Sequence, residues 1–148
     1  FYFLTNLEIN NPYTFNINML NKPIVAVTSF HEAYGIEIKD KPTANLPDQI
    51  STLRFNLMKE ENEEYLTAVK EGDLVEVGDA LGDMLYILCG TIIAHGFQNK
   101  IEAIFDEIQR SNMSKLGANG KPIYREDGKV MKGPNYFKPD LKKILDKD

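Results

Sequence analysis

The chain has 148 residues and a formal net charge of −5, with 43% hydrophobic and 26% charged residues. This length suits one domain with its own core, and the composition is ordinary for a soluble globular protein. The acidic balance argues against a general nucleic-acid binder. A single cysteine, Cys89, excludes an internal disulfide and gives no sign of an oxidising compartment.

No segment is typical of a membrane span or a secretion signal. The longest apolar candidate, residues 84–94, is shorter than the roughly 18 residues that a span requires, and it contains Gly90 and Thr91. The N-terminus lacks the basic start and small-residue cleavage site of a signal peptide. We therefore expect a cytoplasmic protein that engages neither membranes nor nucleic acid.

Residues 1–18 differ from the rest of the chain, because they are rich in asparagine and aromatic residues and precede Met19, a natural start. Two interpretations stand equally: a non-native leader, or an N-terminal arm that packs on a partner subunit. Residues 19–148 are expected to form one domain.

The first helices are marked by proline starts and glycine ends. Residues 24–34 follow Pro23 and read as a helix ending at Gly35, although β-branched residues leave a strand open for the first half. Phe30, His31 and Tyr34 could line a base-binding pocket, but aromatic residues at helical spacing are more often core. A second helix is predicted from residues 47–48 to about residue 70.

The predicted third helix begins after a glycine–aspartate pair. Gly72 can end the second helix, Asp73 can cap the next, and that helix runs to about residue 95 before Gly96. A fourth helix over residues 99–113 carries an apolar face made of Ile101, Ile104, Phe105 and Ile108.

The character of the chain then changes, with four glycines among lysines between residues 114 and 133. Asp127–Gly128 between short apolar runs signals a hairpin turn, and Pro139–Asp140 opens a last short helix. The lysines could cover phosphates or form a solvated loop, and composition favours neither. The pattern as a whole predicts an all-α fold, a bundle of four to five helices with a short C-terminal hairpin or loop.

Residues 57–90 hold the main candidate site, on two helices joined by the turn at 71–73. Helical steps from Leu57 and back from Ile93 follow the apolar faces of the two helices. These steps reach Glu61, Glu64 and Ala68 in the first helix, and Gly90, Tyr86, Asp83, Asp79 and Glu76 in the second. Both faces therefore become acidic at a similar position along the hairpin, where the two helices should face each other.

Burying several carboxylates together costs roughly several kcal/mol for each ion unless a cation compensates. A solvated helix face is the alternative, and it suits Glu63 and Glu71 best. Carboxylate oxygens are hard ligands that fit Mg²⁺ or Mn²⁺, whereas the two histidines, His31 and His95, lie outside the acidic patch. No P-loop, Rossmann fingerprint or nucleophile elbow competes with this site. Its obvious use is to hold metal ions that neutralise a polyphosphate and activate water.

Three segments carry a resemblance to a known family. Residues 59–64, KEENEE, resemble the EExxE motif of the all-α nucleoside triphosphate pyrophosphohydrolases, a superfamily that includes MazG, dimeric dUTPases and phosphoribosyl-ATP pyrophosphohydrolase. Residues 79–86, DALGDMLY, look like the second motif, ExxD followed by an apolar segment. Residues 110–115, RSNMSK, with 127–132, DGKVMK, resemble the phosphoribosyl-ATP pyrophosphohydrolase-like branch. The likeness covers about residues 24–146.

The second motif departs from the family at Ala80, which stands where ExxD has its glutamate. A strict ExxD also occurs one turn earlier, over residues 76–79. Because residues 79 and 83 share a helix face, Asp79 could replace the missing ligand, with Glu76 as the other option. The resemblance thus implies a metal site, and catalysis by Glu60 and Glu61, with Glu60 orienting or deprotonating water. The expected metal ligands are Glu61, Glu64, Asp79 and Asp83.

The implied activity is Mg²⁺-dependent hydrolysis of a nucleoside triphosphate between the α and β phosphates, and Mn²⁺ is a possible substitute for Mg²⁺. The implied biological role is the removal of unwanted nucleotides. Its expected substrate contacts are Arg110, Asn112, Lys115, Lys129 and Lys132. The family habit implies a homodimer or homotetramer. The alternatives are phosphoribosyl-ATP hydrolysis in histidine synthesis, and a non-catalytic helical module that binds a metal or a partner.

Overall fold

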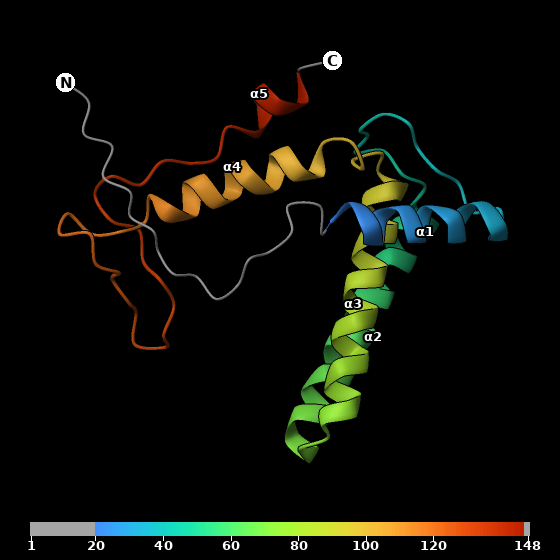
Figure 1. Ribbon diagram of the computed structural model, residues 1–148, viewed down its shortest axis with the longest axis horizontal. Coiled ribbons are helices and arrows are strands. Elements are labelled where there is room, and N and C mark those ends of the chain that lie inside the picture. The colour runs from blue at the N-terminus through green and yellow to red at the C-terminus, as the bar shows by residue number, and fades with distance from the viewer. Residues whose placement is uncertain (1–19, 147–148) are drawn as a thin grey trace.

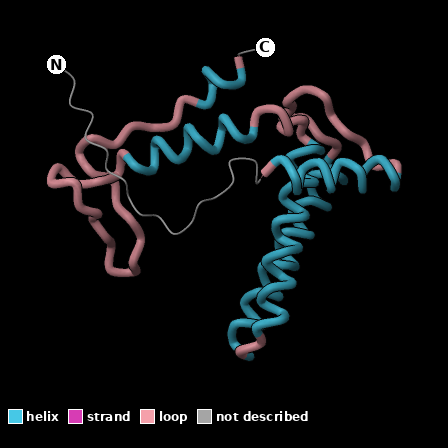
Figure 2. Tube along the Cα trace, viewed as in Figure 1, coloured by secondary structure: helices cyan, strands magenta, loops and turns pink. Residues whose placement is uncertain are grey.

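The computed structural model describes residues 20–146, so the predicted arm or leader at residues 1–18 lies outside them. The elements in that range are α1 (Asn21–Tyr34), α2 (Asp48–Glu71), α3 (Leu74–Ala94), α4 (Ile101–Met113) and α5 (Leu141–Leu145) (Figure 1). An isolated bridge between Tyr124 and Val130 is the only β pairing among the described residues, and loops make up the rest (Figure 2). The all-α prediction is confirmed.

The ends of the helices follow the local signals in the sequence. Gly35 and Gly72 end α1 and α2 in the left-handed conformation, with φ of 64° and 71°. The Asp73 side chain then caps α3 by accepting hydrogen bonds from the backbone N–H groups of Val75 and Glu76. The first half of α1 is helical, so the strand alternative for that segment is wrong.

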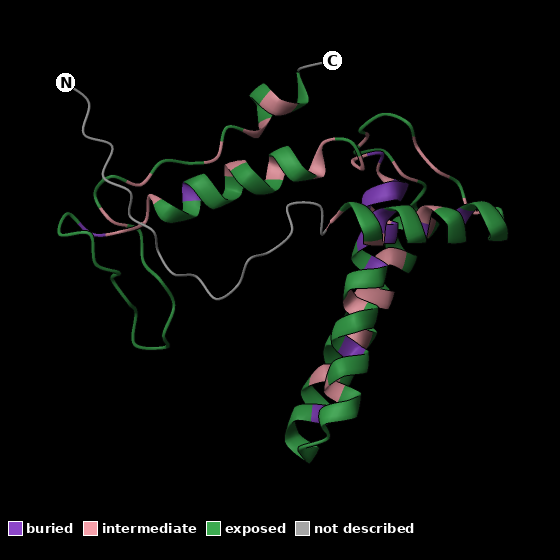
Figure 3. Cartoon of the chain, viewed as in Figure 1, coloured by how far each residue is buried: buried purple, intermediate pink, exposed green. Residues whose placement is uncertain are grey.

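The helix α3 is the centre of the fold, because both α1 and α2 pack against it. The core lies where α1 crosses its C-terminal half, and its buried members are Ile24, Val27, Cys89, Ile92 and Ile93. Figure 3 shows that burial is concentrated at this crossing, while the α2–α3 hairpin extends beyond it with mostly exposed residues. The hairpin is therefore anchored at one end.

The connection between α1 and α2 is tied to the C-terminal end of α3. Lys39 N donates to the carbonyl of Ile93, and Thr43 N donates to the carbonyl of His95. The His95 Nδ1 also lies 2.8 Å from the Thr43 carbonyl oxygen. Gly96, with φ of 72°, allows this approach, because a Cβ there would lie 2.2 Å from the Lys41 carbonyl oxygen. These hydrogen bonds hold the end of the hairpin that lies opposite the turn between α2 and α3.

The helix α4 leads the chain away from the hairpin, and the C-terminal segment returns along it (Figure 1). Ser111 Oγ donates to the carbonyl of Phe137 at 2.8 Å, and Phe137 N donates to Ser114 Oγ at 3.1 Å. Asp140 N donates to Glu107 Oε1 at 2.7 Å, next to α5. The predicted turn at residues 127–128 and the short helix after Pro139 are both confirmed.

The helix α3 is also long and apolar enough to cross a membrane, which the shorter run at residues 84–94 did not suggest. Length and composition are weak evidence, because the core helix of a soluble protein passes the same test. In this structure the helix packs against α1 and α2, and 39% of its apolar window is buried.

Replacing Gly96 by alanine should lower the free energy of unfolding by about 3 kcal/mol or more, since strain at positive φ adds to the clash with Lys41. The matched control is Gly35→Ala, which shares the positive φ but has no atom within 4 Å of the added Cβ. It should cost only about 1–2 kcal/mol. Urea unfolding of the two variants measures the difference, and equal losses would show that the contact with Lys41 is unimportant.

Candidate active site

Glu61 lies on the face of α2 that turns towards α3, between the half-buried Leu57 and the buried Ala68. The residue is half-buried, and its Oε2 atom has neither solvent contact nor a hydrogen-bond partner. A buried carboxylate oxygen without a partner is costly, and no described side chain offsets this cost at Glu61. The apolar residues that flank Glu61 hold it there.

The electrostatic surroundings of Glu61 combine carboxylates from both helices. Burial raises the pKa of the Glu61 carboxyl above its usual value, and repulsion from Glu64, Asp83, Glu60 and Asp79 raises this pKa further, in that order. The four proposed metal ligands and the proposed water-orienting carboxylate therefore form one coupled group. The prediction that carboxylates of both helices line the contact is wrong for Glu64, Asp79 and Asp83, which are exposed, whereas Glu61 is half-buried.

The face of α3 that packs on α2 differs from the one that stepping back from Ile93 indicated. Ala80 is 2% exposed and Ile87 is 9% exposed, whereas Asp79 and Asp83 are exposed. The two aspartates thus lie beside the contact between the helices instead of within it. Small Ala80 fills the contact position, so the side chain at the family's glutamate position faces α2.

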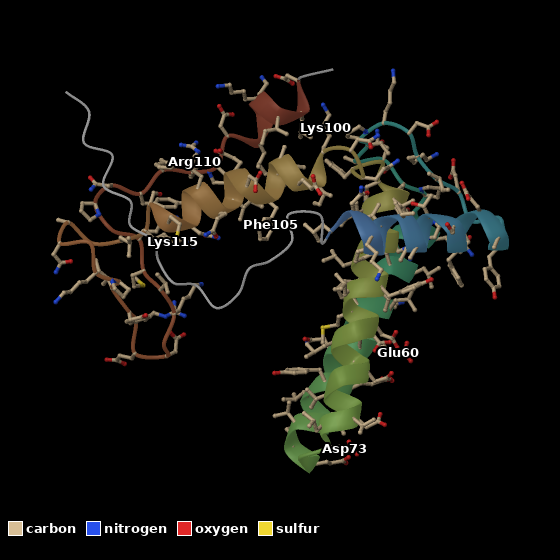
Figure 4. The ribbon with its side chains drawn as sticks, in the orientation of Figure 1. Glu60, Asp73, Lys100, Phe105, Arg110 and Lys115 are labelled. Carbon is tan, nitrogen blue, oxygen red and sulfur yellow. The ribbon has the colours of Figure 1, made fainter. Side chains whose placement is uncertain are left out.

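A hollow of about 500 Å³ follows the open side of the hairpin. Its lining comes from both helices: Glu60, Glu63, Glu64, Thr67, Ala68, Glu71 and Glu76. Figure 4 shows Glu60 along the hairpin and Asp73 at its tip. The hollow brings Glu76, the alternative ligand, to the same surface as Glu60 and Glu64.

The residues fit a hard divalent cation, although their side chains are spread apart in this arrangement. Across residues 20–146, no three histidine, cysteine, aspartate or glutamate side chains stand close enough to hold a metal ion. Like charges favour such spreading, and the partnerless oxygen of Glu61 with its carboxylate neighbours offers the donors that Mg²⁺ and Mn²⁺ prefer. A cation would remove the repulsion that raises the pKa of Glu61.

The predicted substrate contacts are not brought to the hairpin. They lie on α4 and the segment after it: Arg110, Asn112, Lys115, Lys129 and Lys132. Figure 4 shows Arg110 and Lys115 far from Glu60. The acidic and basic halves of the predicted site are therefore separate within one chain.

Arg110 and Lys115 have partners on their own element. Arg110 forms a two-point ion pair with Glu107, at 2.8 Å for each N–O pair, and its guanidinium lies 4.3 Å from the centre of the Phe137 ring. The hydrogen bond from Arg110, joined by that from the Asp140 backbone, lowers the pKa of Glu107 to about 2. Lys115 Nζ donates to Asn112 Oδ1 at 2.7 Å. These contacts hold the basic side chains on α4.

A buried polar contact where α1, α2 and α3 meet was not identified from the sequence. His31 is 1% exposed, and a Cβ at Gly90 would lie 3.2 Å from its Nε2 and 2.8 Å from Arg54 Nη1. His31 Nδ1 and Arg54 Nε have no hydrogen-bond partner. The glycine in an apolar helix was the available signal, because it leaves room for two large polar side chains.

Glu61→Gln should raise the thermal midpoint of the metal-free protein at pH 7 by up to about 4 °C, because it removes a repelled carboxylate. A raised folded pKa favours the protonated form, so the gain should shrink as the pH falls and Glu61 takes up its proton. The matched control is Glu63→Gln, since Glu63 is exposed and lies 3.7 Å from Lys59 Nζ. A larger gain from the control would contradict the assignment of the repulsion to Glu61.

Acidification should destabilise the fold through His31. Burial, and then the neighbouring Arg54 charge, lower the pKa of His31 below its usual value, so the unfolded chain binds more protons as the pH falls. The free energy of unfolding should therefore fall below about pH 6.5, by at most about 1.4 kcal/mol per pH unit. His31→Gln should flatten this slope between pH 5 and 7. A slope that survives His31→Gln would refute the assignment.

Comparison with known proteins places the hairpin within a known family. The family model of phosphoribosyl-ATP pyrophosphohydrolase matches residues 27–112. The uncharacterized protein L479 of Acanthamoeba polyphaga mimivirus is 30% identical over 102 residues, which make up 67% of this chain and 37% of that protein. The chain thus spans little more than a third of this relative's length. Because the family model covers more than half of the chain and all the hairpin carboxylates, the chain belongs to the phosphoribosyl-ATP pyrophosphohydrolase family.

Proposed function

We propose that the protein is a Mg²⁺-dependent nucleotide pyrophosphohydrolase that converts a nucleoside or deoxynucleoside triphosphate to the monophosphate and pyrophosphate. The observation that carries this proposal is Glu61, whose partnerless buried oxygen lies among four further carboxylates. Membership of the family supports pyrophosphohydrolase chemistry. Clearing non-standard nucleotides is the biological role that we propose.

The chain's own residues would divide the work along the hairpin. Glu61, Glu64, Asp79 and Asp83 would hold the cation, which supplies charge neutralisation for the polyphosphate and polarises its oxygens when bound. Glu60, exposed on the hollow, would accept a proton from the attacking water. The water oxygen then bonds to phosphorus, and the bond to the bridging oxygen between the α and β phosphates breaks, releasing pyrophosphate.

Hydrolysis of phosphoribosyl-ATP is the alternative within the same family, and its chemistry would use the same carboxylates. The lysine-rich segment after α4 argues for a different substrate, and activity on phosphoribosyl-ATP decides between the two. A non-catalytic module remains a separate class, because Ala80 replaces a family glutamate. That hypothesis requires metal binding without turnover.

The deciding experiment measures pyrophosphate release from a panel of canonical and modified nucleotides and from phosphoribosyl-ATP, with Mg²⁺ or with EDTA. We expect metal-dependent release that falls by a factor of about 10² or more in Glu61→Gln, since this change removes a ligand charge. Glu63→Gln is the matched control and should keep most of the activity, because Glu63 does not contribute to the coupled group around Glu61.

Each of the other outcomes identifies a different error. Release that persists in EDTA would refute the role of the cation. No release from any substrate, together with a Mg²⁺-induced rise in thermal midpoint, would favour the non-catalytic module. Equal losses in the two variants would show that the hollow matters as a whole and that Glu61 has no special part.

A further inference from the structure

Three aromatic side chains gather on the surface where α1 crosses α3, in what we call the aromatic cluster. Phe30 and Tyr34 come from the C-terminal half of α1, and Tyr86 comes from the C-terminal half of α3. Their exposed fractions are 37%, 71% and 41%. The rings form one continuous group, because the Phe30 centroid lies 4.3 Å from that of Tyr34 and 5.7 Å from that of Tyr86.

Core packing does not account for the aromatic cluster. The buried residues of α1 are Ile24, Val27 and His31, which are 6%, 2% and 1% exposed. Of the residues that the sequence suggested for a base-binding pocket, His31 is thus enclosed, whereas Phe30 and Tyr34 reach the surface. Leaving large apolar side chains in water is less favourable than burying them, so neighbouring exposed rings indicate a binding surface.

The aromatic cluster lies next to the proposed cation ligands along α3. Asp79, Asp83 and Tyr86 occupy positions i, i+4 and i+7 of one helix, so their side chains follow one another on the same face. All three are exposed. At a rise of about 1.5 Å per residue, Tyr86 lies about 5 Å beyond Asp83 along the helix axis, in the direction of α1. A ligand held at the carboxylates can therefore reach the cluster.

The chemistry of the aromatic cluster fits a planar heteroaromatic ring. Nucleobases stack on exposed aromatic side chains, and this contact accepts every base because it uses the face of the base and not its edge. In a nucleotide, only the sugar separates the base from the α-phosphate. A substrate whose phosphates bind a cation at the carboxylates therefore has its base close to them.

The two sides of the carboxylates differ in what they can bind. Towards the turn between α2 and α3, the hollow is lined by five glutamates. Such a surface attracts cations and offers no aromatic face to a base. Towards α1, the next exposed group on the same face of α3 is Tyr86, with Phe30 beside it. The base of a bound nucleotide therefore fits on the side of α1.

We propose that the aromatic cluster of Phe30, Tyr34 and Tyr86 stacks the nucleobase of the substrate. The cluster recognises the face of the base, so the site accepts many bases and prefers purines, whose larger face covers more of the rings. This inference rests on the proposed function and names its substrate class: purine nucleotides, including modified ones, ahead of pyrimidine nucleotides.

Binding of two non-hydrolysable compounds tests the proposal without turnover. One is adenosine triphosphate with a methylene group in place of the oxygen between the α and β phosphates, and the other is the same compound without its base. In calorimetry with Mg²⁺, the adenine compound should bind the wild type about 10-fold more tightly or better, which is the range of base stacking. Tyr86→Leu and Phe30→Leu should each lose about 10-fold in affinity for the adenine compound and keep their affinity for the baseless one.

Two control variants separate the ring from other effects of substitution. Tyr86→Phe keeps the aromatic face and should retain the affinity for the adenine compound. Phe105→Leu is the matched control, because Phe105 is 57% exposed on α4 and lies far from Glu60 in Figure 4. This variant should bind both compounds as the wild type does. The corresponding cytosine compound should bind the wild type more weakly than the adenine compound.

Several results would overturn the role of the aromatic cluster. These are equal affinity of the wild type for the adenine and baseless compounds, unchanged affinity of Tyr86→Leu for the adenine compound, and an equal loss for both compounds, which would reduce Tyr86 to a structural role. Cytosine binding as tight as adenine binding would refute the purine preference.

The proposed function fails or stands separately from this inference. Base-dependent binding in a protein that releases no pyrophosphate would keep the aromatic cluster and reject the hydrolysis. Pyrophosphate release together with base-independent binding would keep the hydrolysis and reject the cluster. Binding of neither compound would reject both.

Discussion

Repulsion among carboxylates at the seam between α2 and α3 is the constraint on which the rest of the structure depends. The Glu61 carboxyl is partly withdrawn from water, one of its oxygens has no partner, and four neighbouring carboxylates raise its pKa. A fold tolerates such a group only when other contacts offset its cost. Here those contacts lie at the opposite end of the hairpin, where α1 and the α1–α2 connection hold α3.

The division of labour along α3 follows from this arrangement. Its C-terminal half is buried against α1, with Cys89 and Ile93 fully enclosed, and it supplies the stability of the chain. Its N-terminal half carries Asp79 and Asp83 on an exposed edge. The stabilising contacts of α3 and its acidic residues thus lie in different halves of the helix, so substitutions at the carboxylates leave the contacts with α1 in place.

Local signals predicted much of the fold. Gly72 and Asp73 specify the hairpin turn by themselves, since one adopts positive φ and the other caps the next helix. Glu61 was also predictable, because it continues an apolar helical face. The face of α3 that packs on α2 was not predictable, because small residues and carboxylates alternate in this part of the helix. A shift of one position exchanges Asp79 for Ala80. The contact of His31, Arg54 and Gly90 was likewise hidden, because three helices must meet to form it.

The placement of the lysines shows where local reasoning ends. The motifs around residues 110–115 and 127–132 suggested phosphate contacts, but their distance from the carboxylates depends on the direction of α4, which no sequence pattern specifies. That direction has an energetic consequence. Opposite charges kept apart within one chain cannot neutralise each other, so the hairpin retains its repulsion and the lysine-rich segment after α4 retains its attraction for anions. The proposed cation and polyphosphate would relieve the repulsion in the hairpin when they bind. Metal binding and substrate binding would then reinforce each other, since each removes a cost that the other would otherwise meet.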